Sequence, residues 1–295
     1  MNPELLSHLS AVIRDATQRP FSARDATPVG EGSINEAYRL EGTDGSRYFL
    51  KLNDAQHLPM FAAEAQGLNA IAATNTLRVP QPVAHGTTNS NSFLVLEYLE
   101  LSSRGNAKRL GEQLAALHRC TNGKFGFAQG NYIGTTPQPN GWKDNWMDFW
   151  REQRLGFQLR LAAQNGHGGK LQDLGEKLLD ALPAFFDGYA PQPALLHGDL
   201  WSGNNAFLAD GTPVIFDPAP YYGDREADLA MTELFGGYPA DFYAAYRAAY
   251  PLDDGYAVRK DLYNLYHILN HANLFGGGYA RQAEGMMQGL LAGVG

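Results

Sequence analysis

The chain has 295 residues, a formal net charge of −8 at pH 7 and a hydrophobic content of 44%. These values allow a buried core in one large domain or in two lobes, and they exclude a disordered chain. The acidic balance argues against nucleic acid and anionic membranes as partners. A single cysteine, Cys120, excludes an intramolecular disulfide. The first residues do not form a basic region followed by an apolar core, and no run of about 18 apolar residues occurs, so we expect a cytoplasmic protein.

The first hundred residues read as helices combined with antiparallel strands. Apolar residues recur at helical spacing over 3–18 and over 59–74, which predicts two helices. Strands are expected over 37–40 and 47–52, because Asp44-Gly45 between them is a strong hairpin turn signal. A further strand is expected over 92–100, and we place the boundary between two lobes at about residue 100.

A glycine-containing loop precedes the first predicted hairpin. Gly30, Gly32 and Ser33 lie in it, and glycine allows backbone N–H groups to approach a phosphate closely. The signal is weak by itself, because a short Gly-x-Gly is more often an ordinary turn.

Lys51 lies in an otherwise apolar strand, which is where kinases place the lysine that holds the α- and β-phosphates. Glu64, on the helix that follows, is the best candidate to pair with it. A solvent-facing Lys51 and an exposed Glu64 remain the alternatives.

The second part of the chain is predicted to be mainly helical. Helices are expected over 109–119, 145–165, 171–182, 228–235 and 261–275. Residues 121–145 are rich in Gly, Asn, Thr and Pro and read as a long loop that is either functional or wraps the surface. On the last helix, the polar residues His267, Asn270, His271 and Asn273 either line an acceptor pocket or satisfy one another.

The chemistry-bearing stretch runs from Leu195 to Asn204. Asp199 and Asn204 fit the D-x-x-x-x-N pattern in which the aspartate takes a hydroxyl proton and the asparagine binds Mg²⁺. A hairpin turning at Asp210-Gly211 should bring Asp217 back beside Asn204 as a second magnesium ligand. The pattern predicts phosphoryl transfer. A Ser-His-Asp hydrolase is disfavoured because no Gly-x-Ser-x-Gly elbow occurs, and a metal hydrolase would need more ligands near His197.

Two further residues are assigned structural roles. Asp228 opens an apolar helix, and it is expected either to cap that helix or to hydrogen-bond the backbone of the catalytic loop. His118 is expected to be a structural residue near a helix end.

The chain resembles the fructosamine kinases, also called ketosamine 3-kinases, within the protein-kinase-like phosphotransferases. The match covers nearly the whole chain, and the most particular part is the filling Leu200-Trp201-Ser202-Gly203 together with Asp217-Pro218-Ala219. The other stretches that carry the resemblance are residues 30–35, 125–127, 141–149, 235–237 and 269–276.

The resemblance implies a bilobal α+β fold. Residues 1–100 would form an antiparallel-sheet lobe that binds ATP and ends in the hinge, and residues 101–295 a mainly helical catalytic and acceptor-binding lobe. The implied reaction is ATP- and Mg²⁺-dependent phosphorylation of the 3-hydroxyl of a ketosamine, free or on a glycated amine or protein, which is a step in protein deglycation. Another small acceptor, such as an aminoglycoside or sugar, and a non-catalytic nucleotide-binding regulator are the alternatives.

The resemblance also implies roles for single residues. Asp199 would be the base, Lys51 and Glu64 the pair that positions phosphate, and Trp201 and His271 the contacts with the sugar. The remaining roles are magnesium binding by Asn204 and Asp217, and adenine binding by the hinge residues Glu97, Tyr98 and Leu99.

Two departures from related proteins are visible. Many members carry a cysteine in the glycine loop where this chain has Ser33, so we expect a monomer or weak dimer without a disulfide. Protein kinases have Asp-Phe-Gly where this chain has Asp217-Pro218-Ala219, and proline fixes φ there, which argues against a flipping activation switch.

Overall fold

The computed structural model describes residues 1–30 and 34–294. The chain divides into two compact units. The first unit is formed by residues 1–105 together with 206–217, and the second by residues 106–205 together with those from Pro218 onward. Among the described residues, no helix is both long and apolar enough to cross a membrane.

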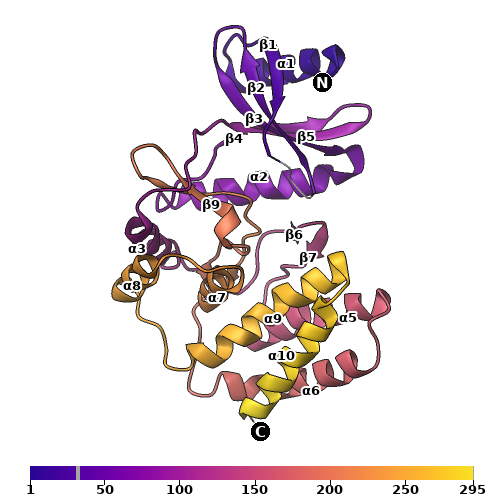
Figure 1. Ribbon diagram of the computed structural model, residues 1–295, viewed down its shortest axis with the longest axis vertical. Coiled ribbons are helices and arrows are strands. Elements are labelled where there is room, and N and C mark those ends of the chain that lie inside the picture. Colours follow the sequence, from indigo (N-terminus) through magenta and orange to yellow (C-terminus); the bar gives the residue numbers. More distant parts are fainter. Residues whose placement is uncertain (31–33, 295) are drawn as a thin grey trace. The chain divides into compact units, whose positions relative to one another are not determined.

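The first unit is built on a five-stranded antiparallel sheet with the strand order β1-β2-β3-β5-β4 (Figure 1). Its strands are β1 (Ala23–Pro28), β2 (Glu36–Gly42), β3 (Arg47–Asp54), β4 (Pro82–Thr87) and β5 (Asn91–Glu97). β2 and β3 pair in register from Glu36 opposite Leu52 to Glu41 opposite Arg47, across the predicted Asp44-Gly45 turn.

Two helices cover this sheet. Helix α1 (Pro3–Thr17) begins at the N-cap Asn2, whose side chain accepts from the N–H of Leu5, and it packs Leu9 and Ile13 onto one face. Helix α2 (Leu58–Ala73) packs against β4 and β5. Because alternate residues of a strand point to opposite faces, each central strand supplies side chains to both helices.

A hairpin from far along the sequence completes the first unit. Strands β9 (Asn205–Phe207) and β10 (Pro213–Ile215) pair with each other. Ser102 forms an antiparallel bridge with Phe207, and Arg78 forms a parallel bridge with Val214. These backbone contacts hold residues 206–217 against the link that leads into β4 and the link that follows β5.

The second unit is mainly helical. Helix α9 is central, since it packs against α7, α5 and α10, while α10 also packs on α6 and α3 packs on α8 (Figure 1). The helices are α3 (Ala107–Leu117), α4 (Trp146–Trp150), α5 (Gly156–Gln164), α6 (Lys170–Phe185), α7 (Glu226–Leu234), α8 (Ala240–Ala249), α9 (Tyr256–Phe275) and α10 (Tyr279–Val294).

The second unit also contains two pairs of short strands. β8 (Ala194–Leu195) pairs with β11 (Tyr222–Gly223), and β6 (Asn131–Ile133) pairs with β7 (Thr136–Gln138). The predicted loop over 121–145 therefore contains a small hairpin. A π-helical turn, Arg151–Leu155, joins α4 to α5 and carries the fully buried Arg154.

Candidate active site

A buried lysine in the first unit contacts two carboxylates. Leu50 and Leu52 point into the core beneath α1, so strand alternation directs Lys51 to the face that α2 covers. Its Nζ atom lies 2.7 Å from Glu64 Oε1 and 2.5 Å from Asp217 Oδ1. The structure thus brings together three of the residues singled out in the sequence.

The charges in this cluster keep the lysine protonated. Lys51 is only 7% exposed, and burial lowers the pKa of its ammonium. The negative charges of Asp217 and Glu64 outweigh that effect and hold the pKa above its ordinary value. Burial also raises the pKa of Glu64 to about 7, because the single lysine charge only partly opposes it. A lysine that stays charged suits the neutralisation of phosphate oxygens.

Asp217 has an unusual backbone conformation. Its φ of 56° lies in the left-handed region, which costs a residue other than glycine about 1 kcal/mol or more and is often found at functional sites. Its side chain is 45% exposed. Two residues earlier, the N–H of Ile215 donates to the carbonyl of Arg78 at 3.0 Å, which fixes the approach of the chain to Asp217.

The predicted catalytic loop, residues 197–204 of the second unit, begins with a close approach of two backbones. Gly198 has a φ of 84°, and a Cβ atom there would lie 2.0 Å from the carbonyl oxygen of Ala219. The N–H of Ala219 donates to the carbonyl of His197 at 2.9 Å. Only glycine permits this contact, which explains the glycine in His197-Gly198-Asp199.

Asp228 on α7 binds the backbone at the start of the same loop. Its carboxylate accepts from the N–H of His197 at 2.7 Å and from that of Gly198 at 2.8 Å. Burial favours a raised pKa for Asp228, but its hydrogen bonds and the nearby His118 lower the pKa, so the carboxylate is charged. Of the two roles predicted for Asp228, the structure contains the contact with the loop backbone.

A short 3₁₀ turn at the end of the loop brings Asn204 into contact with Asp199. Within this turn (Ser202–Asn204), Asn204 Nδ2 donates to the Asp199 carbonyl at 2.9 Å and lies 3.4 Å from Asp199 Oδ2. The amide nitrogen is thereby used, and Oδ1 is the atom of Asn204 that a hard cation would bind.

The donor set fits magnesium better than a transition metal. Among the described residues, no group of three or more His, Cys, Asp or Glu is arranged to hold a metal. Mg²⁺ needs few protein oxygens because it keeps waters and binds substrate phosphates. One amide oxygen from Asn204 and one carboxylate from Asp217 match that requirement. Their meeting stays a prediction, because the two residues belong to different units.

Trp201 presents an exposed ring between Asp199 and Asn204. Its side chain is 38% exposed and lies directly over Gly203, where an added Cβ would meet the ring at 2.2 Å. Phe235 makes an edge contact with Trp201 and a tilted contact with His271. The two residues predicted to contact sugar thus lie on either side of one phenylalanine.

For the predicted residues of the glycine loop and the hinge, the structure says less about their roles. Gly30 has a left-handed φ of 76°, whereas Gly32 and Ser33 lie outside the described residues. At the predicted hinge, Glu97 forms an ion pair with Arg78, and the Tyr98 ring lies under the guanidinium of Arg47. Leu99 follows them. The role of these hinge residues in binding adenine stays a prediction.

The sequence missed several residues that support the loop. Gln138 donates to the carbonyl of Ala219 at 3.0 Å and accepts from the Tyr266 hydroxyl at 2.8 Å. His118, which the sequence assigned a structural role, is fully buried and joins Asp228 to the hydroxyl of Tyr246. A polar residue on an otherwise apolar element indicates that a buried partner exists. The sequence does not identify that partner, because it lies more than 80 residues away.

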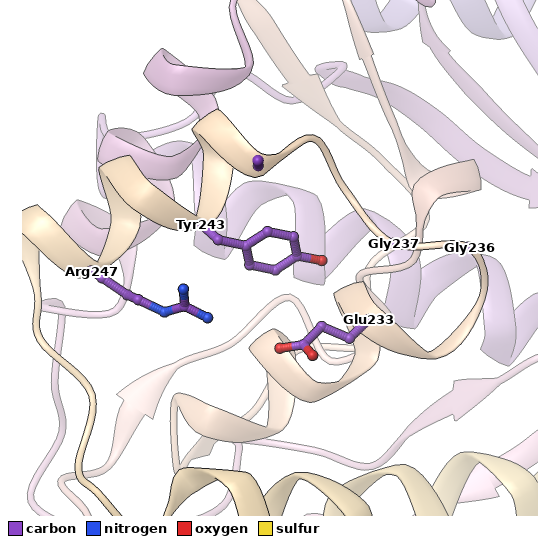
Figure 2. Close-up of a pocket in the computed structure, with 6 residues that line it drawn as sticks. Glu233, Gly236, Gly237, Tyr243 and Arg247 are labelled. Atoms are coloured by element: carbon purple, nitrogen blue, oxygen red, sulfur yellow. The ribbon is translucent and has the colours of Figure 1, made fainter.

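An open cavity of about 400 Å³ lies elsewhere in the second unit, between the end of α7 and α8 (Figure 2). Glu233, Tyr243 and Arg247 point toward it, and Gly236 and Gly237 form its rim. Glu233 is already bound by Lys260 and by the Tyr256 hydroxyl. None of the predicted site residues lines this cavity.

Comparison with known proteins places the chain among kinases. The family model for fructosamine kinase matches residues 5–293. A protein named "Probable ketoamine kinase" from Synechocystis sp. is 51% identical over 95% of this chain and 94% of its own length. The chloroplastic protein-ribulosamine 3-kinase of Arabidopsis thaliana is 42% identical over 89% of this chain and 81% of its own.

Solved structures confirm the predicted α+β, protein-kinase-like fold. A crystal structure from Haemophilus somnus 129PT, named as a candidate fructosamine-3-kinase, superposes with a TM-score of 0.87 at 30% identity and covers 96% of both chains. Aminoglycoside phosphotransferases share the fold at 10–13% identity. The match of the family model to nearly all residues, together with these relatives, shows that the chain belongs to the fructosamine kinase family.

Proposed function

We propose that the chain is an ATP-dependent kinase that phosphorylates the 3-hydroxyl of a ketosamine. The match of residues 5–293 to the fructosamine kinase model is the observation that carries this proposal. Relatives named for ketoamine and ribulosamine kinase activity support it over most of the chain. The acceptor would be a ketosamine, free or on a glycated amine or protein.

Asp199 is assigned as the general base. Its carboxylate takes the proton of the acceptor hydroxyl as that oxygen bonds to the γ-phosphorus and the bond to the β–γ bridging oxygen breaks, which yields ADP and the ketosamine phosphate. The hydrogen bonds from Asn204 hold Asp199 in place, and those that Asp228 accepts hold the preceding backbone. This support restricts the motion of the base, so that its carboxylate is positioned before the reaction.

The phosphate side of the reaction is assigned to four residues. Lys51, oriented by Glu64, would contact the phosphates, and Asn204 and Asp217 would supply oxygens to Mg²⁺, which neutralises charge on the phosphate oxygens. Asp217 contacts Lys51 through Oδ1, so Oδ2 of the same carboxylate would be the oxygen offered to the metal. Gly30, Gly32 and Ser33 would cover the phosphates, and Glu97, Tyr98 and Leu99 would meet adenine.

The acceptor side is assigned to Trp201 and His271. An exposed indole suits the apolar face of a sugar, and His271 suits a sugar hydroxyl because an imidazole can both donate and accept a hydrogen bond.

Replacement of the base tests the assignment. We expect Asp199→Asn to lower kcat by about 10²–10⁴-fold with a fructosamine or ribulosamine acceptor and to leave ATP affinity nearly unchanged. The exposed Asp187→Asn should retain wild-type turnover. Near-normal turnover by Asp199→Asn would contradict the assigned mechanism.

A panel of acceptors separates the alternatives. ADP release would be measured with ketosamines, aminoglycosides and simple sugars in the presence of ATP and Mg²⁺. Turnover of ketosamines supports the proposal. Turnover of another acceptor alone would favour a kinase of different specificity, and ATP binding without any turnover would favour a regulator.

A further inference from the structure

Four aromatic side chains continue outward from Trp201 on the surface of the second unit. We call Phe235, His271, Phe275 and Tyr279 the aromatic strip. Ring centroids are separated by 6.5 Å from Trp201 to Phe235, by 5.0 Å from Phe235 to His271 and by 5.5 Å from His271 to Phe275. Tyr279 lies beside His271 at 5.2 Å. The contacts form one continuous path that begins inside the catalytic loop.

The outer end of the strip is exposed where the fold does not require an aromatic residue. Phe275 is 57% exposed at the last position of α9, and among the described residues it is the most exposed large hydrophobic side chain. A single exposed apolar residue is ordinary on a protein surface. Phe275, however, is linked through the half-buried rings of His271 and Phe235 to Trp201, which is 38% exposed, and connected aromatics at a surface often mark a binding site.

Glycines leave the space around the strip open. Phe235 and Phe275 are each followed by two glycines with left-handed φ, between 63° and 91°. A Cβ atom added at Gly236, Gly276 or Gly277 would meet no atom within 4 Å. Among the described residues, no side chain fills the volume beside Gly236, Gly276 or Gly277, whereas the Tyr243 hydroxyl would lie 3.9 Å from a Cβ atom at Gly237.

The faces of the strip are also free of the protein's own cations. Among the described residues, none of the cation–π contacts involves a ring of the strip. Aromatic faces attract cations, and long alkyl chains pack along apolar surfaces. A ketosamine offers a cation, because its nitrogen is a secondary ammonium. It also offers an alkyl chain where the amine that carries the sugar has an alkyl arm. A carboxylate beside that nitrogen would instead meet the negative faces of the rings.

We propose that the aromatic strip binds the alkyl arm of the amine that carries the sugar, so that the enzyme prefers ketosamines on long, uncharged arms over those with a carboxylate next to the nitrogen. This inference rests on the proposed function and specifies which acceptors it favours. The sugar lies at Trp201, and the carrier arm extends over Phe235 and His271 toward Phe275.

An acceptor series with one sugar and a varied amine tests the strip. The fructosamines of methylamine, butylamine, hexylamine and glycine are compared by kcat/KM at saturating ATP. We expect the wild type to gain about tenfold from methylamine to hexylamine, mainly through KM, because added methylenes cover apolar surface. The glycine derivative should be the poorest acceptor.

Substitutions at Phe275 then assign the gain to the strip. Phe275→Ala should reduce the gain to about twofold or less, and Phe275→Leu should restore part of it because it keeps apolar area. Trp142→Ala is the matched control, since Trp142 is 43% exposed, stacks on Tyr222 and makes no ring contact with the strip among the described residues. It should keep the full wild-type gain. Because Phe275 is exposed, its variants should keep the wild-type melting temperature.

Two results would overturn the inference, and they are distinct from failure of the proposed function. If the wild type phosphorylates all four fructosamines equally, or if Phe275→Ala keeps the full gain, the strip does not bind the amine arm. The kinase assignment is unaffected by either result. If no fructosamine or ribulosamine is phosphorylated, the proposed function fails and the strip assignment fails with it.

Discussion

Individual glycines of this chain carry very different constraints. Gly198 and Gly166 have similar left-handed φ values, 84° and 88°. A side chain at Gly198 would collide with the Ala219 carbonyl, whereas a Cβ at Gly166 would meet no atom within 4 Å. The pair therefore separates the cost of backbone strain from the cost of steric collision.

Alanine substitution at these two positions should show the difference. We expect Gly166→Ala to cost about 1–2 kcal/mol of unfolding free energy, from strain alone, and to keep wild-type turnover. Gly198→Ala should cost more than this and lower kcat by about 100-fold or more, because it displaces the backbone that positions Asp199. Urea denaturation and steady-state kinetics measure both quantities. Equal effects of the two variants would contradict this interpretation.

At the scale of an element, helix α9 carries a buried histidine one turn before His271, the predicted sugar contact. It buries His267, which is 5% exposed and whose Nδ1 atom has no hydrogen-bond partner among the described residues. Burial, with smaller contributions from the charges of His271 and Arg154, lowers the pKa of His267 to about 3, although Asp228 acts in the opposite direction. The imidazole is neutral in the folded protein.

This burial makes stability depend on pH in a defined direction. The pKa of His267 is lower in the folded chain than the unfolded value of about 6.5, so the unfolded state binds more protons below that pH. The contribution to stability is complete above pH 6.5 and declines as the pH falls toward 3. Between pH 7.5 and 5.0 we expect His267 to account for a loss of up to about 2 kcal/mol.

Urea denaturation of His267→Leu at the two pH values checks this. The variant should lose about 2 kcal/mol less than the wild type between pH 7.5 and 5.0. The control His85→Gln, at an exposed position on β4, should follow the wild type. An unchanged pH dependence in His267→Leu would show that the buried histidine is not responsible.

Elements with strong periodicity could be predicted, whereas elements defined by distant partners could not. The helix predicted over 59–74 is α2, and the hairpin at Asp44-Gly45 is β2–β3, because local spacing and turn chemistry determine both. β1 and β6–β7 are short and polar and are strands only through their pairing partners. β4 begins at Pro82, two residues after Pro80, and this proline spacing by itself indicates only an extended segment. The same limit applies to the site. Asp199 and Asn204 are five residues apart and recognisable, whereas Gln138 supports the segment beside them from 81 residues away.

At the scale of the whole molecule, two units share the proposed chemistry. Lys51, Glu64 and Asp217 belong to the first unit, and Asp199 and Asn204 to the second. The sequence predicts a boundary between two lobes at about residue 100. The structure also includes residues 206–217 in the first unit. The assignment of ATP to one lobe and acceptor to the other stays a prediction, which nucleotide binding can address.

Binding of ATP should stabilise the whole chain in a magnesium-dependent way. At about 100 times the Kd, a ligand adds about 2.7 kcal/mol, which for a chain of this length corresponds to a rise of roughly 4–5 °C in Tm. We expect EDTA to remove part of this rise. Asp217→Asn should lose the magnesium-dependent part and keep the rest, while Asp144→Asn, at a side chain that is 83% exposed, should behave as the wild type. A full magnesium effect in Asp217→Asn would exclude Asp217 as a ligand.

The hairpin β9–β10 has a consequence for how the protein is made. The polypeptide leaves the first unit at residue 105, returns at 206 and leaves again at 217. During translation the sheet of the first unit is synthesised early, but Arg78 and Ser102 acquire their backbone partners only after about a hundred further residues have left the ribosome. Asp217, which contacts Lys51, is the last residue of that unit to be made. The nascent first unit therefore has to persist without its final segment, and a gene cut at the apparent lobe boundary would separate Lys51 from one of its two carboxylates.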